Sequence, residues 1–205
     1  EERGGLLGLE AANGLMRRGM TVSVVHVMPT LMERQLDTVA GKLLQKSLEE
    51  RGLTFLMGAQ TQELVGGEDG RVKSIKFKDG TEVAADLVVM AVGIRPNTTL
   101  AESMRLHCNK GIVVNDTMQT TTDARIYSVG ECAAHRGIAY GLVAPLFEQA
   151  KVAANHLAQF GIGRYQGSLT STKLKVTGID LFSAGEFQGG EGTEEIVMSD
   201  PFGGV

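Results

Sequence analysis

The first residues whose spacing suits chemistry are the glycines near the start of the chain, in the run Gly4–Gly8. A helix that begins directly behind such glycines can bring its backbone N–H groups close to a pyrophosphate. In the pattern G-x-G-x-x-G, Gly5 and Gly8 supply the second and third glycines, whereas Arg3 holds the first position and would crowd the tight turn. Helix packing alone is the alternative explanation. The run predicts an incomplete dinucleotide-binding fingerprint.

A histidine stands where the next strand, expected over Thr21–Val27, comes to its end. Dinucleotide-binding folds commonly place an acid there, which bonds the adenine ribose. His26 could bond a ribose hydroxyl or, when protonated, a 2'-phosphate. A residue satisfied within its own fold is the alternative. A histidine at this position therefore argues against strict use of NADH, without establishing that NADPH is used.

A third signal is an acid that follows a glycine at the end of a short strand, Ile126–Val129. A carboxylate in that place can accept hydrogen bonds from ligand hydroxyls, while the bare glycine backbone passes close to phosphate. Gly130 and Glu131 are therefore candidate ligand-binding residues. Cys108 and Cys132 are too far apart for a C-x-x-C pair and too few for a metal or cluster site. We expect two buried thiols in a reduced, cytoplasmic setting and no metal site.

The elements that must position these residues begin as helix, strand, helix, strand. The expected ranges are Leu6–Arg18, Thr21–Val27, Asp37–Arg51 and Leu53–Met57. The order is that of an α/β doubly wound parallel sheet in which no strand precedes the first helix. We therefore expect the chain to begin inside a domain, and an unpaired sheet edge could pair two copies as a homodimer.

The pattern then changes to that of strands joined by tight turns. Glu63–Val65, Val72–Phe77 and Glu82–Val92 predict an antiparallel meander, with a hairpin signal at Asp79-Gly80. The last part, Asp86–Val92, is expected to return to the parallel sheet.

The second half alternates short strands with one long helix. Strands are expected at Gly111–Asn115 and Ile126–Val129, and a helix at Gly141–Phe160. Two further strands, Lys173–Val176 and Leu181–Phe187, would begin a C-terminal α+β domain.

Composition excludes several classes of function. The 205 residues are 42% hydrophobic and 21% charged, with a net charge of -4. Such a chain is an ordinary globular protein and a poor partner for nucleic acid or an anionic membrane. Its longest apolar runs are far shorter than the roughly 20 residues of a membrane span, and no signal peptide is recognisable.

Three motifs together resemble the flavoprotein reductases with two dinucleotide-binding domains: Gly4–Glu10, Val92–Pro96 and Ile126–Cys132. Within that FAD/NAD(P)-dependent pyridine-nucleotide oxidoreductase superfamily, three more segments resemble the large subunits of assimilatory NAD(P)H nitrite reductases: Met28–Asp37, Gly141–Pro145 and Ser171–Lys175. The resemblance implies a fragment with a Rossmann-like NAD(P)H-binding domain over 1–92, the second segment of an FAD-binding domain over 93–160, and a truncated C-terminal domain over 161–205.

The resemblance also assigns candidate cofactor residues. Those expected near NAD(P)H are Gly5, Gly8, Glu10, His26 and Gly93. Those expected near FAD are Gly130, Glu131, Leu142, Val143 and Lys173. No catalytic residue is named, because hydride transfer between the two cofactors requires no acid or base.

The implied function is hydride transfer from NAD(P)H to FAD, with electrons passed on to metal centres that reduce nitrite to ammonia. The iron-sulfur cluster, the sirohaem and a small subunit as partner would belong to the parent enzyme and lie outside this chain, which alone would be inactive. A ferredoxin or rubredoxin reductase is the nearer alternative. A degenerate nucleotide-binding scaffold is the alternative from another class.

Overall fold

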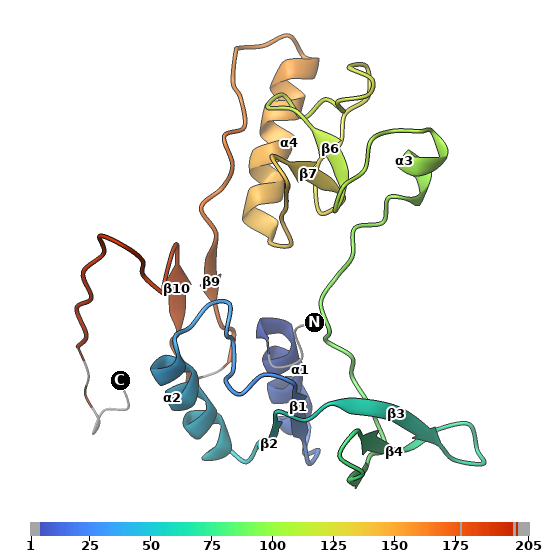
Figure 1. The fold of residues 1–205 in the computed structure, drawn as a ribbon, viewed down its shortest axis with the longest axis vertical. Helices are drawn as coiled ribbons and strands as arrows, with labels where there is room; N and C mark the ends of the chain where they lie inside the picture. The colour runs from blue at the N-terminus through green and yellow to red at the C-terminus, as the bar shows by residue number, and fades with distance from the viewer. Residues whose placement is uncertain (1–4, 177, 199, 201–205) are drawn as a thin grey trace. The chain divides into compact units, whose positions relative to one another are not determined.

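The computed structural model describes residues 5–176, 178–198 and 200. They fall into two compact units (Figure 1). The first unit lies within Glu1–Gly93 and Ser171–Val205, and the second is Ile94–Thr170. The expected division into 1–92, 93–160 and 161–205 stays a prediction.

A parallel pair of strands forms the centre of the first unit. β1 (Ser23–His26) and β2 (Thr54–Met57) run in parallel, with Val24 opposite Phe55. α1 (Leu6–Met16) precedes β1, and α2 (Thr38–Glu49) crosses from β1 to β2. Parallel strands need such a crossover. The predicted order of helix, strand, helix, strand is confirmed.

The two helices bury their apolar faces in one cluster. Leu9 of α1 and Leu44 and Leu48 of α2 are buried there. At the start of α2 the Asp37 carboxylate accepts the amide of Ala40 at 2.7 Å, which satisfies one of the amides that a helix start leaves free. Leu31 and other residues of the loop after β1 complete the cluster. This core holds the loop and both helices in fixed relation to the strands.

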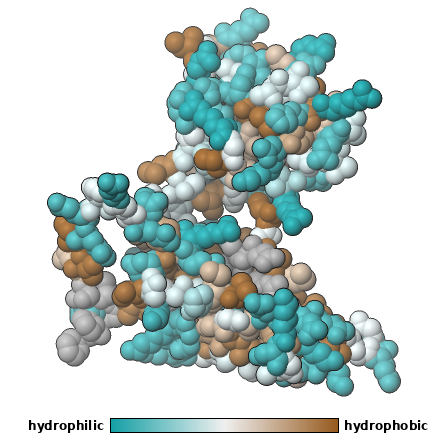
Figure 2. All heavy atoms as spheres, viewed as in Figure 1, coloured by the Kyte–Doolittle hydropathy of each residue, from teal (hydrophilic) through white to brown (hydrophobic). Residues whose placement is uncertain are grey.

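The antiparallel meander follows β2. β3 (Thr61–Gly66), β4 (Val72–Phe77) and β5 (Glu82–Ala84) form a three-stranded sheet in the order of the sequence. The turn between β4 and β5 contains Gly80 in the left-handed region (φ 87°), as a tight hairpin requires. Figure 2 shows hydrophilic side chains gathered over the β3 and β4 hairpin.

The expected strand over Asp86–Val92 is wrong. Residues 87–92, all of which the structure describes, have no regular secondary structure. A cavity of about 430 Å³ lies between this segment, α1 and β1. A strand requires a neighbour for its N–H and C=O groups, and on this side the segment faces the cavity. Three of its apolar side chains, those of Leu87, Val89 and Met90 (70%), are exposed.

The C-terminal part packs on the first unit. β9 (Ser171–Lys173) and β10 (Phe182–Ala184) form an antiparallel pair. β10 is a shorter strand within the expected Leu181–Phe187, whereas the expected strand Lys173–Val176 is wrong, because β9 ends at Lys173 and shares only that residue with it. Leu174 and Val176 lie in the same buried cluster as Leu9. Three long-range hydrogen bonds, from Arg51 to Gly178, from Ser183 to Gln35 and from Lys175 to Glu10, connect this part to the α1 and α2 region.

The second unit combines a small mixed sheet with one long helix. β6 (Ile112–Val114) pairs in parallel with β7 (Ala133–His135), and β7 pairs in antiparallel fashion with β8 (Ile138–Ala139). α4 (Val143–Leu157) lies within the predicted Gly141–Phe160. The unit also contains a short helix, α3 (Thr99–Ser103).

The expected strand Ile126–Val129 is also wrong. Its residues form a single bridge, Tyr127 with Gln119, because this stretch folds back on the preceding turn. The sheet strand is instead β7, which directly follows Cys132.

Among the described residues, no helix is long and apolar enough to cross a membrane.

Candidate cofactor-binding sites

Among the described residues, the N-terminus of α1 has no side-chain cap. Gly5 is the N-cap residue (φ -81°, ψ -179°), no side chain caps the helix, and the first turn carries no acidic residue. The first amides of a helix lack intrahelical partners and carry a partial positive charge. An anionic group can therefore accept hydrogen bonds there. Arg3, which departs from the glycine pattern, and Gly4 lie outside the described residues.

The carboxyl end of β1 lies at this same end of the unit. α1 packs against β1 and is joined to it by residues 17–22 only, so helix and strand run in opposite directions. Since β1 and β2 are parallel, His26 and Met57 end at one edge. Ligands of open α/β sheets bind outside the carboxyl ends of the strands. The first unit thus presents an uncapped helix start and two strand ends on one edge.

Gly8 and Glu10 occupy different environments on α1. Gly8 lines the cavity beside β1 and the segment Ala85–Val92. The carboxylate of Glu10 accepts the backbone amide of Lys175 at 3.0 Å. Glu10 is therefore an acceptor for the C-terminal segment in this structure.

His26 is placed in the interior. Its side chain is fully buried, and Nε2 lies 3.0 Å from the Thr30 carbonyl oxygen and 3.1 Å from Glu33 Oε2. In β1 every second residue faces the core, and His26 is two positions after the buried Val24. This alternation is the sequence signal that His26 points inward. The side chain of Glu33 is 21% exposed. The sequence did not predict Glu33 as a site residue, because no local pattern shows that the loop after β1 returns to the end of the strand.

Gly93 follows the irregular segment with φ 87°, in the left-handed region that favours glycine. It is exposed and is the last residue of the first unit before Ile94 begins the second. Its backbone angle explains a glycine here independently of any ligand.

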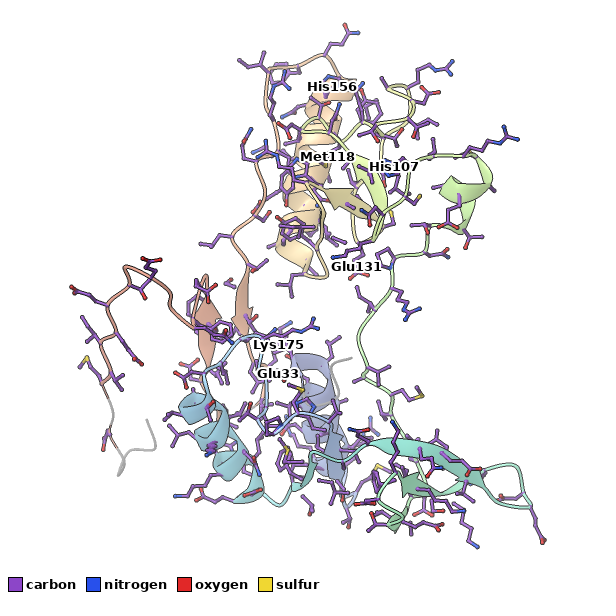
Figure 3. The ribbon with its side chains drawn as sticks, viewed as in Figure 1. Glu33, His107, Met118, Glu131, His156 and Lys175 are labelled. Carbon is purple, nitrogen blue, oxygen red and sulfur yellow. The ribbon has the colours of Figure 1, made fainter. Side chains whose placement is uncertain are left out.

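The second unit brings Gly130 and Glu131 together with α4. Gly130 has φ 95°, and its amide donates to the buried Gln149 Oε1 of α4 at 2.9 Å. Glu131 follows immediately and is exposed (Figure 3). The hydrogen bond from Gly130 fixes the backbone that carries the Glu131 carboxylate. Gln149 is a positioning residue that the sequence alone did not reveal.

The start of α4 is a second uncapped helix N-terminus. Leu142 is the N-cap residue, its side chain makes no capping hydrogen bond, and the first turn contains no acid. Val143 is 68% exposed, so the first turn is accessible. Pro145 stands in that turn, where its missing N–H costs nothing. This helix end favours a partial negative charge on a bound group.

Other polar clusters of the second unit support its loops. Asp116 bonds both Arg136 and the buried His135, and these two hydrogen bonds, that of Arg136 being the larger, hold the pKa of Asp116 below its ordinary value. The Tyr127 hydroxyl lies 2.6 Å from His156 Nδ1. These side chains satisfy one another, and we assign them a structural role.

Lys173 belongs to β9 of the first unit and is well exposed. Its Nζ lies 3.6 Å from Asp180 Oδ1, a weak surface ion pair. Nothing in this environment fixes Lys173 as a ligand, and its expected place beside the flavin stays a prediction. Across residues 5–176, 178–198 and 200, no group of three or more metal-ligating side chains is found.

Comparison with known proteins identifies the family. The family model described as pyridine nucleotide-disulphide oxidoreductase matches residues 4–156. The chain is 58% identical over 202 residues to nitrite reductase [NAD(P)H] of Bacillus subtilis, covering 98% of this chain and 25% of that protein. It is 32% identical to rubredoxin-NAD(+) reductase of Acinetobacter baylyi, over 75% of this chain and 39% of the relative. These matches confirm the resemblance seen in the motifs.

A solved structure supports the same fold. An FAD-dependent pyridine nucleotide-disulphide oxidoreductase from Desulfovibrio vulgaris superposes with a TM-score of 0.80 at 27% identity, covering 89% of this chain and 47% of the other. The chain spans about a quarter of the length of the nitrite reductase it matches. By the family match over 4–156, the chain belongs to the pyridine nucleotide-disulphide oxidoreductase family.

Proposed function

We propose that this chain supplies the NAD(P)H site and part of the FAD site of a flavoprotein oxidoreductase that reduces nitrite. The observation that carries the proposal is the uncapped, acid-free start of α1 at the carboxyl edge of a parallel strand pair. The 58% identity to a nitrite reductase supports the substrate. Residues 1–92 would form the NAD(P)H domain, 93–160 the second FAD segment and 161–205 the beginning of a C-terminal domain.

The residues of the first unit fit a dinucleotide. The first amides of α1, behind Gly5, would bind the pyrophosphate, and Gly8 would leave room for the cofactor in the first turn of the helix. Gly93 would turn the chain away from the same edge. These groups bind and orient, and none of them needs to exchange a proton.

The residues of the second unit fit a flavin. The exposed Glu131 carboxylate can accept hydrogen bonds from ribityl or ribose hydroxyls, with its backbone held through Gly130 and Gln149. The uncapped start of α4 at Leu142 and Val143 would lie against the electron-rich part of the ring system. When bound, the nicotinamide and the flavin supply hydride transfer. Iron-sulfur and sirohaem chemistry, and a small subunit, are proposed only for the whole protein.

The test of the NAD(P)H site is a pair of substitutions in α1. Gly5→Asp puts a carboxylate on the free amides, and we expect it to weaken NADH and NADPH binding by about tenfold or more. Gly14→Asp makes the same change at an exposed site of the same helix and should bind as the unchanged protein does. Binding is measured by nicotinamide fluorescence. If neither dinucleotide binds the unchanged protein, the site is a scaffold and the proposal is wrong.

The FAD site is tested in the same way in the second unit. Glu131→Gln should weaken flavin binding, measured by quenching of flavin fluorescence, because the amide accepts hydrogen bonds less well than a carboxylate. Glu102→Gln removes a carboxylate from α3, outside the proposed site, and is the matched control. Equal binding by both variants would contradict the assignment of Glu131.

An alternative acceptor is favoured by one observation, the 32% identity to a rubredoxin reductase over 75% of the chain. In that case the electrons would pass to a small redox protein in place of nitrite. The two are separated by the rate at which the full-length protein oxidises NADH with nitrite or with rubredoxin as the sole acceptor. Nitrite-dependent oxidation is the result we expect.

A further inference from the structure

The loop between β1 and α2, residues 27–37, is fixed from within. Leu31 and Met32 are fully buried and belong to the same cluster as Leu9 of α1. Met32 adopts φ 52°, a conformation that a non-glycine residue keeps only when its surroundings hold it. Its carbonyl accepts the amides of Gln35 at 2.8 Å and Leu36 at 2.9 Å. The loop is therefore a rigid platform.

Glu33 is held on this platform by His26. His26 Nε2 lies against two oxygen groups, the Thr30 carbonyl and the Glu33 carboxylate. A carbonyl and an ionised carboxylate both accept hydrogen bonds and donate none. Nε2 therefore carries a proton and donates it to the pair of oxygens. A carboxylate offers about four acceptor positions over its two oxygens, so the bond to Oε2 leaves capacity on Glu33 for another donor.

The position of Glu33 matches the need for an acid at a strand end. His26 is the last residue of β1, and its buried ring brings Glu33 back to that end although seven residues separate them. The same edge carries the uncapped start of α1. Glu33 lies in the loop that follows β1 (Figure 3). A dinucleotide with its pyrophosphate on α1 would extend its adenine ribose toward the end of the adjacent strand.

We propose that Glu33, positioned by His26, accepts the ribose hydroxyls of the adenosine half and selects NADH over NADPH. This rests on the proposed dinucleotide site. A 2'-phosphate in place of the hydroxyl would bring about two negative charges against the carboxylate and remove a hydrogen-bond donor. His26 is fully buried and so cannot reach a phosphate itself. Its role is to fix the acid, not to contact the cofactor.

Arg34 is the group that opposes this assignment. It is exposed and adjacent to Glu33, and a guanidinium is well suited to a 2'-phosphate. The hydrogen bond from the buried His26 ring holds the Glu33 carboxylate in place, and Arg34 is exposed. Discrimination by Glu33 predicts preference for NADH, and discrimination by Arg34 predicts preference for NADPH, so the two are separable by experiment.

The experiment measures the dissociation constants of NADH and NADPH for the 205-residue chain by nicotinamide fluorescence. We expect the unchanged protein to prefer NADH by about tenfold or more, and Glu33→Gln to lose most of that preference. Glu63→Gln, which removes an exposed carboxylate from β3, should keep it. Arg34→Gln should also keep it.

A second variant tests whether His26 positions the Glu33 carboxylate while the charge of Glu33 is kept. His26→Phe keeps a ring in the core but removes the donor, and should reduce the NADH preference while circular dichroism shows the fold intact. A structural role alone would change both affinities equally and leave their ratio unchanged. Two results would overturn the role of Glu33 and leave the proposed dinucleotide site standing. One is a preference for NADPH that Arg34→Gln abolishes, and the other is a ratio of NADH to NADPH affinity that Glu33→Gln does not change. Failure of both dinucleotides to bind overturns the proposed site as well.

Discussion

The backbone amide of Lys175 donates a 3.0 Å hydrogen bond to the carboxylate of Glu10, a residue of α1. The bond joins the C-terminal segment to the helix whose N-terminus is the proposed pyrophosphate site. Leu174 and Val176, on either side of Lys175, are buried against the same helix region. The segment after 170 thus helps to hold α1 in place, so residues remote in sequence contribute to the dinucleotide end.

Removal of the Glu10 acceptor should loosen this attachment. We expect Glu10→Ala to lower the free energy of unfolding by about 1 kcal/mol, because the bond lies at the surface and water can replace it in part. Hydrogen exchange at the amide of Lys175 should become faster. Glu10→Gln retains an oxygen acceptor and serves as the control. Unchanged exchange in Glu10→Ala would show that buried Leu174 and Val176 suffice to hold the segment.

Replacement of glycine by alanine should have opposite effects on stability at two positions. A Cβ on Gly41 of α2 would lie 3.0 Å from the Leu31 carbonyl oxygen, so Gly41→Ala should push on the loop that carries Glu33 and destabilise the protein by about 1 kcal/mol or more. A Cβ on Gly14 of α1 meets nothing within 4 Å, and Gly14→Ala should stabilise by about 0.5–1 kcal/mol. Urea unfolding measures both, and equal signs would contradict the tight contact at Gly41.

The salt bridge of Asp123 with Arg125 should appear in the pH dependence of stability. The side-chain hydrogen bond from Arg125 lowers the pKa of Asp123 from 3.8 to about 2. A carboxyl whose pKa is lower in the folded state stabilises the fold above its unfolded pKa, and this contribution is lost as the pH falls through the folded value. The stability of Asp123→Asn should therefore fall less steeply between about pH 4 and pH 2. Arg125→Gln should flatten the profile less, because the backbone amide of residue 125 still donates to the Asp123 carboxylate, and a profile as steep as that of the unchanged protein in either variant would contradict the assignment.

The sequence predicted the parts of the fold in which local pattern and tertiary contact agree. The spacing of Leu44 and Leu48 predicted α2, and the structure buries both. The apolar run Asp86–Val92 has the composition of a buried strand, but composition does not supply a pairing partner, and the structure shows none along it in the described residues. The candidate site shows the same division. The glycines before and within α1 form a local sequence pattern, whereas the contact between Glu33 and His26 depends on the path of the loop between them, which residue spacing does not predict.

The open conformation of the segment after β5 gives the last prediction. Met90 is 70% exposed, and Leu48 is fully buried in the first unit. Leu48→Ala should therefore cost about 2–5 kcal/mol of unfolding free energy, and Met90→Ala less than about 0.5 kcal/mol. The amides of residues 87–92 should also exchange with solvent far faster than those of β1, which are paired with β2. A large cost for Met90→Ala together with slow exchange would mean that in solution the segment closes onto β1 as a strand and fills the cavity of about 430 Å³ that separates them here.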